Sequence, residues 1–167
     1  MISTFPRTLA ILCFSVFMST ALNARDIYVD AHATGAADGT NWGDAYTNMA
    51  AAVADANGVI MPDNIHVAAG HYVNFFPYVV TDPCTVRGNG SGPVIFENIT
   101  FARPIFEIDQ TDIHFFDIEF HLSATHVYGH RSGVRFDRCE FSQARLSSVV
   151  GDQCTLMQFD RCNFSHN

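Results

Sequence analysis

The chain has 167 residues, and its 17 Asp and Glu against nine Arg and no Lys give it a formal charge of −8. An acidic chain without basic runs argues against nucleic acid and anionic lipid headgroups as partners. Fifteen phenylalanines against one tryptophan predict a repetitive aromatic core, in a chain long enough to bury one domain.

The first 24 residues are predicted to be a secretory signal peptide. Arg7 is the only charge before the short apolar run of residues 9–18, and small residues follow. The run is shorter than the about 20 residues that span a bilayer. We expect cleavage after Ala24 or Ala21, a secreted or cell-surface protein, and no transmembrane segment thereafter. The alternative is an uncleaved membrane anchor.

Residues 25–64 are predicted to form an N-terminal cap of strand, loop and helix. Residues 26–30 are typical of a strand, and a loop rich in Gly and Asp follows. Residues 44–57 then place apolar side chains at helical spacing, with Asp44 as the expected N-cap and Gly58 as the expected end. We expect this helix to cover the unpaired backbone groups of the first coil.

Residues 65–167 contain a repeated block in which the first, third, sixth and eighth positions are apolar. The copies are Val94–Phe101, Ile113–Phe120, Val134–Phe141 and Met157–Phe164. Their final phenylalanines are 19, 21 and 23 residues apart, and a period in the low twenties with strand-forming content predicts a solenoid. Two outward residues between the third and sixth positions indicate a corner between two short strands.

The predicted fold is all-β: a right-handed parallel β-helix of about four to five coils with an N-terminal capping helix. Stacking would place Phe136 between Phe115 and Phe159, and Cys139 against Cys162. The two cysteines are interpreted either as buried thiols or as a disulfide. The chain looks truncated at its C-terminus, so the open last coil is a candidate site for a partner or for self-association.

The opening of the mature chain resembles that of a known superfamily. The residues are Tyr28–Ala31, Thr34–Gly35, Asp38–Gly39, Trp42, Asp44–Tyr46, Val67–Tyr72 and Thr85–Gly90. They are similar to the start of secreted bacterial β-helix proteins of the pectin-lyase-like superfamily, and of surface proteins related to chlamydial polymorphic outer-membrane proteins. The resemblance implies the fold and not the substrate, because the superfamily contains lyases, glycoside hydrolases, esterases, tailspikes and non-catalytic adhesins.

Four charged residues would stack on one outer edge of the coils: Asp137, Arg138, Asp160 and Arg161. A lyase-like interpretation makes an arginine the base and lets the carboxylates hold calcium against an acidic sugar. The other interpretation is a ladder of ion pairs between coils. We assign no catalytic residue, metal ligand or cofactor from this pattern, and calcium stays an open alternative.

A second candidate surface is the aromatic segment 74–78. Exposed, the side chains of Phe75, Phe76 and Tyr78 could stack on sugar rings or on a partner, whereas turned inward they are core. The favoured interpretation is that they pack back onto the coil.

Two further groups of titratable residues carry weaker interpretations. Glu119 and Glu140 would stack one strand apart, as glycoside hydrolysis requires, but any repeated acid in a solenoid does this. His121, His126 and His130 are predicted to crowd one loop, where surface histidines are commoner than a zinc site.

The sequence favours an exported, non-catalytic β-helix module of a surface or secreted protein that binds a polysaccharide or another cell-surface ligand. The alternative is the N-terminal part of a polysaccharide lyase or glycoside hydrolase with its site on later coils. A purely structural spacer is the third hypothesis.

Overall fold

A computed structural model describes residues 24–58 and 61–166, so the expected signal peptide lies outside the described residues apart from Ala24. The described chain forms three parallel sheets and one helix, α1 (Met49–Ala56). The first sheet has the order β1 (Asp26–Val29), β2 (Asp63–Val67), β5 (Cys84–Gly88), β8 (Asp112–Phe116), β11 (Gly133–Asp137), β14 (Leu156–Asp160). The second has the order β3 (Gly70–Asn74), β6 (Val94–Asn98), β9 (Glu119–His121), β12 (Glu140–Ser142), β15 (Asn163–Ser165). The third has the order β4 (Tyr78–Val80), β7 (Pro104–Asp109), β10 (Ser123–His130), β13 (Ala144–Asp152).

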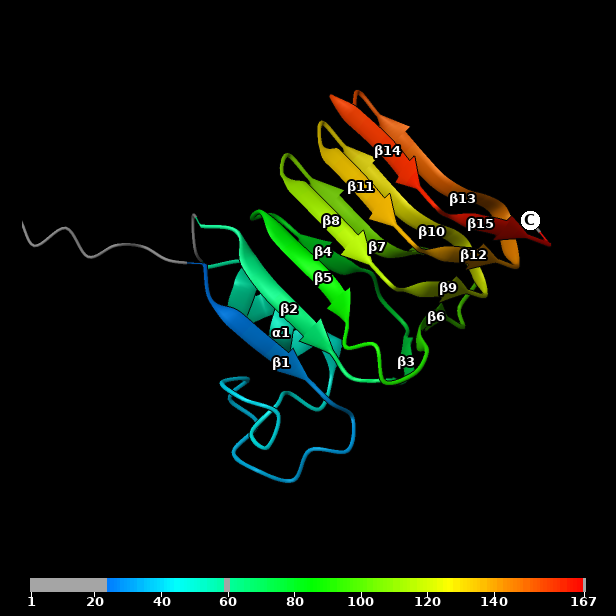
Figure 1. The fold of residues 1–167 in the computed structure, drawn as a ribbon. Coiled ribbons are helices and arrows are strands. Elements are labelled where there is room, and N and C mark those ends of the chain that lie inside the picture. The colour runs from blue at the N-terminus through cyan, green and yellow to red at the C-terminus, as the bar shows by residue number, and fades with distance from the viewer. Residues whose placement is uncertain (1–23, 59–60, 167) are drawn as a thin grey trace, which may run out of the picture.

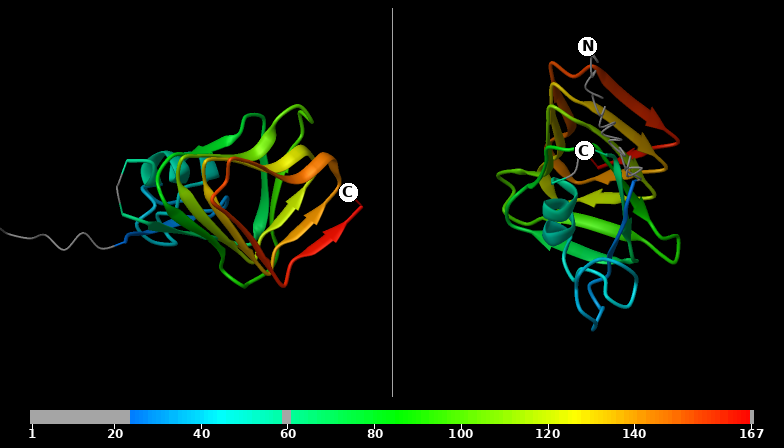
Figure 2. Two further views of the ribbon diagram at one scale, coloured as in Figure 1. Left: turned by 90° about the horizontal axis from the view of Figure 1, so that it is seen from above. Right: turned by 90° about the vertical axis from the view of Figure 1, so that its left-hand side faces the viewer.

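The chain visits the three sheets in turn and then returns to the first, one strand further along (Figure 1). In the described part this gives four complete three-strand coils, from β2–β4 to β11–β13, before β14 and β15. Every strand pair is parallel, and Figure 2 shows the three walls around one interior. The predicted parallel β-helix and its number of coils are confirmed.

Aromatic rings fill the interior in two columns. Phe136 stacks on Phe115 with ring centroids 5.3 Å apart and on Phe159 at 5.0 Å, as the repeat predicted. Phe141 does the same between Phe120, at 5.0 Å, and Phe164, at 4.7 Å. Because each buried phenylalanine contributes about 2–3 kcal/mol by leaving water, these columns dominate the stability of the coils.

The prediction that Val94–Phe101 is a copy of the repeat in phase with the others is wrong. Residues 94–98 form β6 in the second sheet, where Phe96 lies beside Phe120. The equivalent of Phe115 in that coil is Val86 on β5. The expected outward pair of residues 97–98 is buried. Alternation of apolar and polar residues predicts a strand, but it does not show to which of the three sheets that strand belongs.

The corners of the coils use residues in the left-handed region of φ. At the corner between the first and second sheets these are Asp117, Arg138 and Arg161, with φ of 56°, 52° and 52°. Each follows the end of β8, β11 or β14. The two outward residues in the repeat therefore do mark a corner, and they bring equivalent side chains of successive coils into one column.

The helix begins later than expected, and its cap is a different residue. The Asn48 side chain accepts a hydrogen bond from the Ala51 amide at 2.9 Å, and α1 starts at Met49. Asp44 instead organises the preceding loop, accepting from the Ala36 amide and the Asn41 side chain, both at 2.8 Å. These hydrogen bonds lower the pKa of the Asp44 carboxyl. Both Asp and Asn are favourable N-cap residues. Asn48 is the N-cap here because the Asp44 carboxylate is already hydrogen-bonded within the preceding loop.

The helix closes the first end of the interior. Its buried residues Met49 and Val53 join the core beside Ile27. The Asn57 side chain donates to the Val79 carbonyl at 2.7 Å and accepts from the Thr81 amide at 3.0 Å. It thereby satisfies backbone groups on the edge of β4 that no neighbouring strand pairs. Figure 2 shows α1 at the beginning of the solenoid. Within the described residues, no helix has the length and apolar character needed to cross a membrane.

Candidate ligand-binding face

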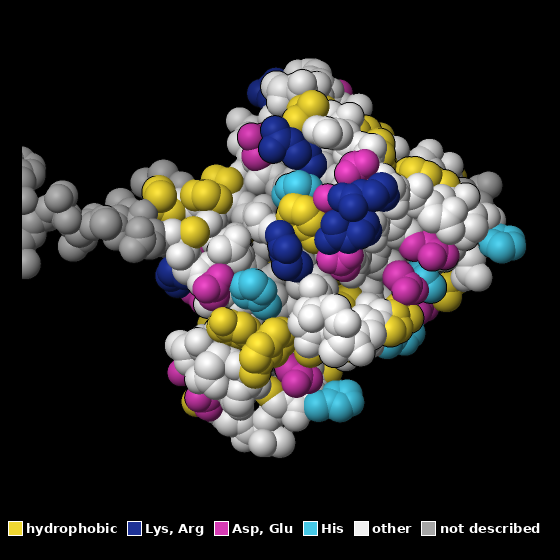
Figure 3. All heavy atoms as spheres, viewed as in Figure 1, with side chains coloured by type: hydrophobic (Ala, Val, Ile, Leu, Met, Phe, Trp, Pro, Cys, Tyr) yellow, Lys and Arg dark blue, Asp and Glu magenta, His cyan; other side chains and the backbone are white. Residues whose placement is uncertain are grey.

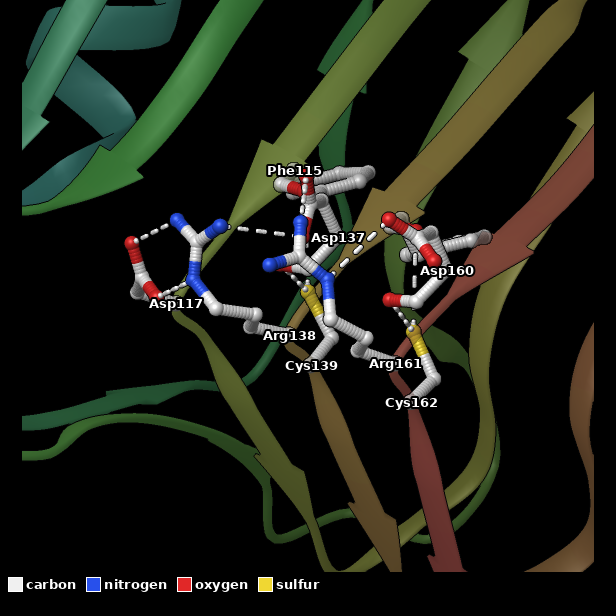
Figure 4. A network of polar contacts seen from close by, with 9 residues as sticks. Phe115, Asp117, Asp137, Arg138, Cys139, Asp160, Arg161 and Cys162 are labelled. Atoms are coloured by element: carbon white, nitrogen blue, oxygen red, sulfur yellow. Dashed lines mark hydrogen bonds and ion pairs between the residues drawn. The ribbon is translucent and has the colours of Figure 1, made fainter.

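The corner between the first and second sheets carries a ladder of ion pairs (Figure 4). Arg138 donates to both oxygens of Asp117 at 2.6 and 2.8 Å and to Asp137 at 3.1 Å. Arg161 donates to both oxygens of Asp137 at 2.8 and 3.0 Å and to Asp160 at 3.1 Å. Three carboxylates and two guanidiniums from three coils thus alternate in one line, which we call the ion ladder.

The charged groups of the ion ladder are paired with one another. The fork of Arg138 on Asp117 raises the pKa of the guanidinium and lowers the pKa of that carboxyl. An arginine held in this way is a poor base, so the geometry gives no support to a lyase-like proton abstraction. Because both guanidiniums and Asp160 are solvent-exposed and Asp117 and Asp137 are only partly buried, each pair contributes only about 0–1 kcal/mol.

Thiols lie directly beneath the ion ladder. Cys139 Sγ donates to the Phe115 carbonyl at 3.6 Å, and Cys162 Sγ makes the same contact with Phe136 one coil later. Burial raises the pKa of the Cys139 thiol to about 12, which suppresses thiolate chemistry. The described cysteines are free thiols, with Cys139 buried and Cys162 partly buried, so the structure agrees with the thiol interpretation and not with the disulfide.

The outer face of the first sheet carries a row of aromatic and cationic side chains that the sequence reasoning missed. Tyr28, His66, Arg87 and Phe116 occupy equivalent positions on four successive strands, β1, β2, β5 and β8. Tyr28 stacks on His66 at 5.2 Å, and Trp42 packs edge-on against Tyr28 at 4.9 Å. The Arg87 guanidinium lies 4.2 Å above the Phe116 ring. We call these five residues the aromatic row.

A polar row runs beside the aromatic row, two residues earlier on each strand. It consists of Thr85, His114 and Arg135 on β5, β8 and β11. Within the described residues neither Arg87 nor Arg135 has a carboxylate within ion-pair distance. Figure 3 shows Arg side chains gathered in the middle of this face, around histidine and hydrophobic atoms.

The residues of both rows could be read from the sequence, but their positions on the sheet could not, because the strand register was unknown. Once β8 is known to point Ile113 and Phe115 inward, alternation forces His114 and Phe116 outward. The match with Arg87 requires the register of β5, which the misplaced copy at residues 94–101 obscured.

The structure separates the three aromatic residues of segment 74–78. Phe75 and Phe76 are 59% and 73% exposed, so the favoured expectation that they pack inward is wrong for both. Tyr78 is buried, with its ring 5.0 Å from Phe106 and 5.9 Å from Phe96. Residues 75–77 connect β3 to β4, and Pro77 directly precedes the point at which the chain re-enters the wall at Tyr78.

The three histidines are not in one loop, as the sequence reasoning had them. His121 ends β9, whereas His126 and His130 lie on β10. His130 Nδ1 is 2.9 Å from Asp152, and His126 points into the core, where neither ring nitrogen has a hydrogen-bond partner. No group of three His, Cys, Asp or Glu residues in the described chain could hold a metal ion.

Glu119 and Glu140 are in register on neighbouring strands, as expected from the repeat. His121 Nε2 lies 3.3 Å from Glu119 Oε2 without the alignment of a hydrogen bond. Both glutamates line a shallow hollow together with Arg138 and Arg161.

Comparison with known proteins gives no relative from which to transfer a function. The chain matches no family model, no curated protein and no solved structure.

Proposed function

We propose that this chain is an exported, non-catalytic β-helix module that binds a carbohydrate of a cell surface or matrix on the outer face of its first sheet. The observation that carries the proposal is the aromatic row. It places flat rings and a guanidinium, for which the described residues supply no carboxylate partner, at equivalent positions on successive strands.

A row of this kind suits an extended sugar chain. Sugar rings have an apolar C–H face that packs on aromatic side chains, while their hydroxyls need polar partners close by. Tyr28 and Phe116 contribute aromatic rings to the row. Between them, Arg87 contributes a guanidinium and His66 an imidazole whose Nε2 lies 2.9 Å from Asp26 Oδ1. The strands are about 4.8 Å apart, so the row presents repeated contacts along one line.

Binding without catalysis is supported by the state of the charged groups. The carboxylates of the ion ladder are all engaged by arginine. The alternative from the sequence, the front part of a polysaccharide lyase or glycoside hydrolase, needs a base or an acid pair on other coils, and it becomes an outcome of the test.

The test compares two double variants of the chain starting at Arg25 on a panel of immobilised polysaccharides. Arg87→Ala with Phe116→Ala removes the centre of the aromatic row. Phe75→Ala with Phe76→Ala is the matched control, because it removes two exposed aromatic residues elsewhere. We expect the first variant to lose about tenfold or more in affinity, equivalent to about 1.4 kcal/mol, with an unchanged melting temperature.

Two results contradict the proposal. If the Phe75 and Phe76 variant loses binding while the row variant keeps it, the ligand lies on the aromatic segment 74–78. If the wild-type chain releases reducing or unsaturated sugar from any bound polysaccharide, the module is an enzyme. Failure of the wild type to bind any member of a broad panel favours the structural spacer.

A further inference from the structure

The polar row lines a hollow on the outer face of the first sheet. The hollow has a volume of about 320 Å³, and Thr85, His114 and Arg135 contribute side chains to it from three neighbouring strands. Pro62 and Leu156 are among the residues at its borders. A hydroxyl, an imidazole and a guanidinium thus face one space that is large enough for a small group of a ligand.

The acids around this space are already engaged. Asp112, which borders the hollow, accepts a hydrogen bond from the Gly133 amide at 2.9 Å. Asp137 is held by both arginines of the ion ladder. Arg135 therefore has no carboxylate partner in the described chain, although the chain as a whole carries 17 acidic residues. A guanidinium left unpaired beside a hollow is suited to an incoming oxyanion.

His114 sits in the middle of the polar row and senses these charges. The neighbouring strand β5 presents Thr85 and Arg87, and β11 presents Arg135 and Asp137. Burial first, and then the charge of Arg135, lower the pKa of His114, with Arg87 acting in the same direction and Asp137 opposing them. These surroundings favour the neutral form of the imidazole.

We propose that the hollow binds one oxyanion group of a ligand, a sulfate ester or a carboxylate, and that His114 takes up a proton from water as the group enters. Arg135, the protonated His114 and the Thr85 hydroxyl donate hydrogen bonds to the oxyanion. The singly negative group is balanced by the single positive charge gained at His114, and no covalent bond is made or broken. The inference rests on the proposed function only in that a sugar chain on the aromatic row is expected to carry the group.

The proton uptake makes capture dependent on pH. An anion offsets the positive charge of Arg135 and Arg87, so it raises the pKa of the neighbouring imidazole in the bound state. By linkage, the anion then binds more tightly wherever the bound protein holds more protons than the free protein. Binding must strengthen as the pH falls through the range in which His114 titrates.

The first experiment uses sodium sulfate and sodium acetate as probes at constant ionic strength, with sodium chloride as the reference. The His114 ring signals are followed by NMR in the wild type and in three variants: His114→Gln, Arg135→Gln and His130→Gln. His130→Gln is the matched control, because that histidine is paired with Asp152 away from the hollow. Calorimetry in two buffers of different ionisation enthalpy measures the protons taken up.

We expect the wild type and His130→Gln to bind sulfate about tenfold more tightly at about pH 5.5 than at about pH 7.5, which corresponds to an uptake of about half a proton on average over this range. The His114→Gln variant should bind with less than about twofold pH dependence, and Arg135→Gln should lose about tenfold at both pH values. Wild-type binding that is independent of pH, or unaffected by both substitutions, overturns the inference.

Polymer probes then separate the two sources of the oxyanion. Dextran sulfate, alginate and unmodified dextran carry sulfate esters, carboxylates and neither group, respectively. Preference for one charged polymer that disappears in Arg135→Gln identifies the group. Binding of all three with equal, pH-independent affinity keeps the carbohydrate function and discards the oxyanion site. Binding of sulfate salts with proton uptake, but of no polymer, keeps the oxyanion site and discards the carbohydrate function.

Discussion

His126 is the residue in the described chain whose chemistry fits its surroundings least well. Its side chain is buried between Phe120 and Phe141, with ring centroids 6.2 and 5.9 Å away, and neither nitrogen has a hydrogen-bond partner. Burial lowers the pKa of His126 to about 4, a contact with the Ser142 backbone opposes this shift, and the nearby His121 acts in the same direction as burial. Burying a polar group without a hydrogen-bond partner lowers the free energy of unfolding, and protonating the buried group lowers it further.

The first prediction is that His126 makes the coils sensitive to acid. The unfolded chain protonates this histidine near its usual pKa of about 6.5, whereas the folded chain keeps it neutral to about pH 4. The unfolded state therefore binds more protons in this window. The titration of His126 therefore leaves the free energy of unfolding unchanged above about pH 6.5 and lowers it by up to about 3 kcal/mol as the pH drops to about 4.

The measurement is the free energy of urea unfolding as a function of pH in the wild type, in His126→Gln and in His130→Gln. Acidic residues contribute equally to all three proteins, so the difference between the curves isolates the histidine. We expect His126→Gln to lose the steep part of the curve between about pH 6.5 and 4 and His130→Gln to keep it. Parallel curves for the wild type and His126→Gln contradict the assignment.

At the scale of elements, the two columns of phenylalanine are what tie successive coils together. Phe136 is buried with parallel rings above and below it, whereas Phe164 is in the second column and is 49% exposed. Phe136→Ala should lower the free energy of unfolding by about 3–5 kcal/mol, because it removes a buried ring and leaves a cavity between two others.

Phe164→Ala is the matched control for that substitution, since it removes the same side chain from the less buried last coil. We expect it to cost less than about half as much. Urea unfolding of both variants decides the matter. Equal losses, or a loss of less than about 1 kcal/mol at position 136, would mean that the columns do not carry the stability.

The elements also show how far sequence reasoning reaches in this fold. The three downstream blocks predicted the strands, the corner and the stacked phenylalanines, because each block sets apolar residues at fixed inward positions. The block at residues 94–101 failed because β6 alternates as the others do but belongs to a different wall. The apolar spacing predicted the helix correctly, but its first residue was wrong, because both Asp44 and Asn48 are suitable N-caps.

For the candidate site, the sequence did not reveal how the strands of successive coils are paired. Most of the ion ladder was visible because the pair Asp137–Arg138 recurs as Asp160–Arg161 at the same position of the next block. The aromatic row has a different residue type on every strand, so no repeat exposes it. Only the pairing of strands that are 20 to 40 residues apart in the chain brings Arg87 over Phe116 and His66 over Tyr28.

At the scale of the whole molecule, the distribution of charge separates one face from the rest. The chain is acidic overall, yet four of its nine arginines lie on the first sheet or at its corner: Arg87, Arg135, Arg138 and Arg161. Screening limits the reach of the net negative charge to about 8 Å at physiological salt. Arg138 and Arg161 are neutralised within the ion ladder, so the cations that remain for a ligand at this face are Arg87 and Arg135. The solenoid thus presents one side that differs in chemistry from the others.

The most direct test of the binding face is an NMR map of the contact. The isotope-labelled chain from Arg25 is titrated with the polysaccharide fragment that binds best in the panel, and the backbone amide shifts are followed. We predict that the largest shifts fall on β2, β5, β8 and β11, around the aromatic and polar rows. Shifts centred on the exposed Phe75 and Phe76, or on the second and third sheets while the first sheet is unaffected, would contradict the account.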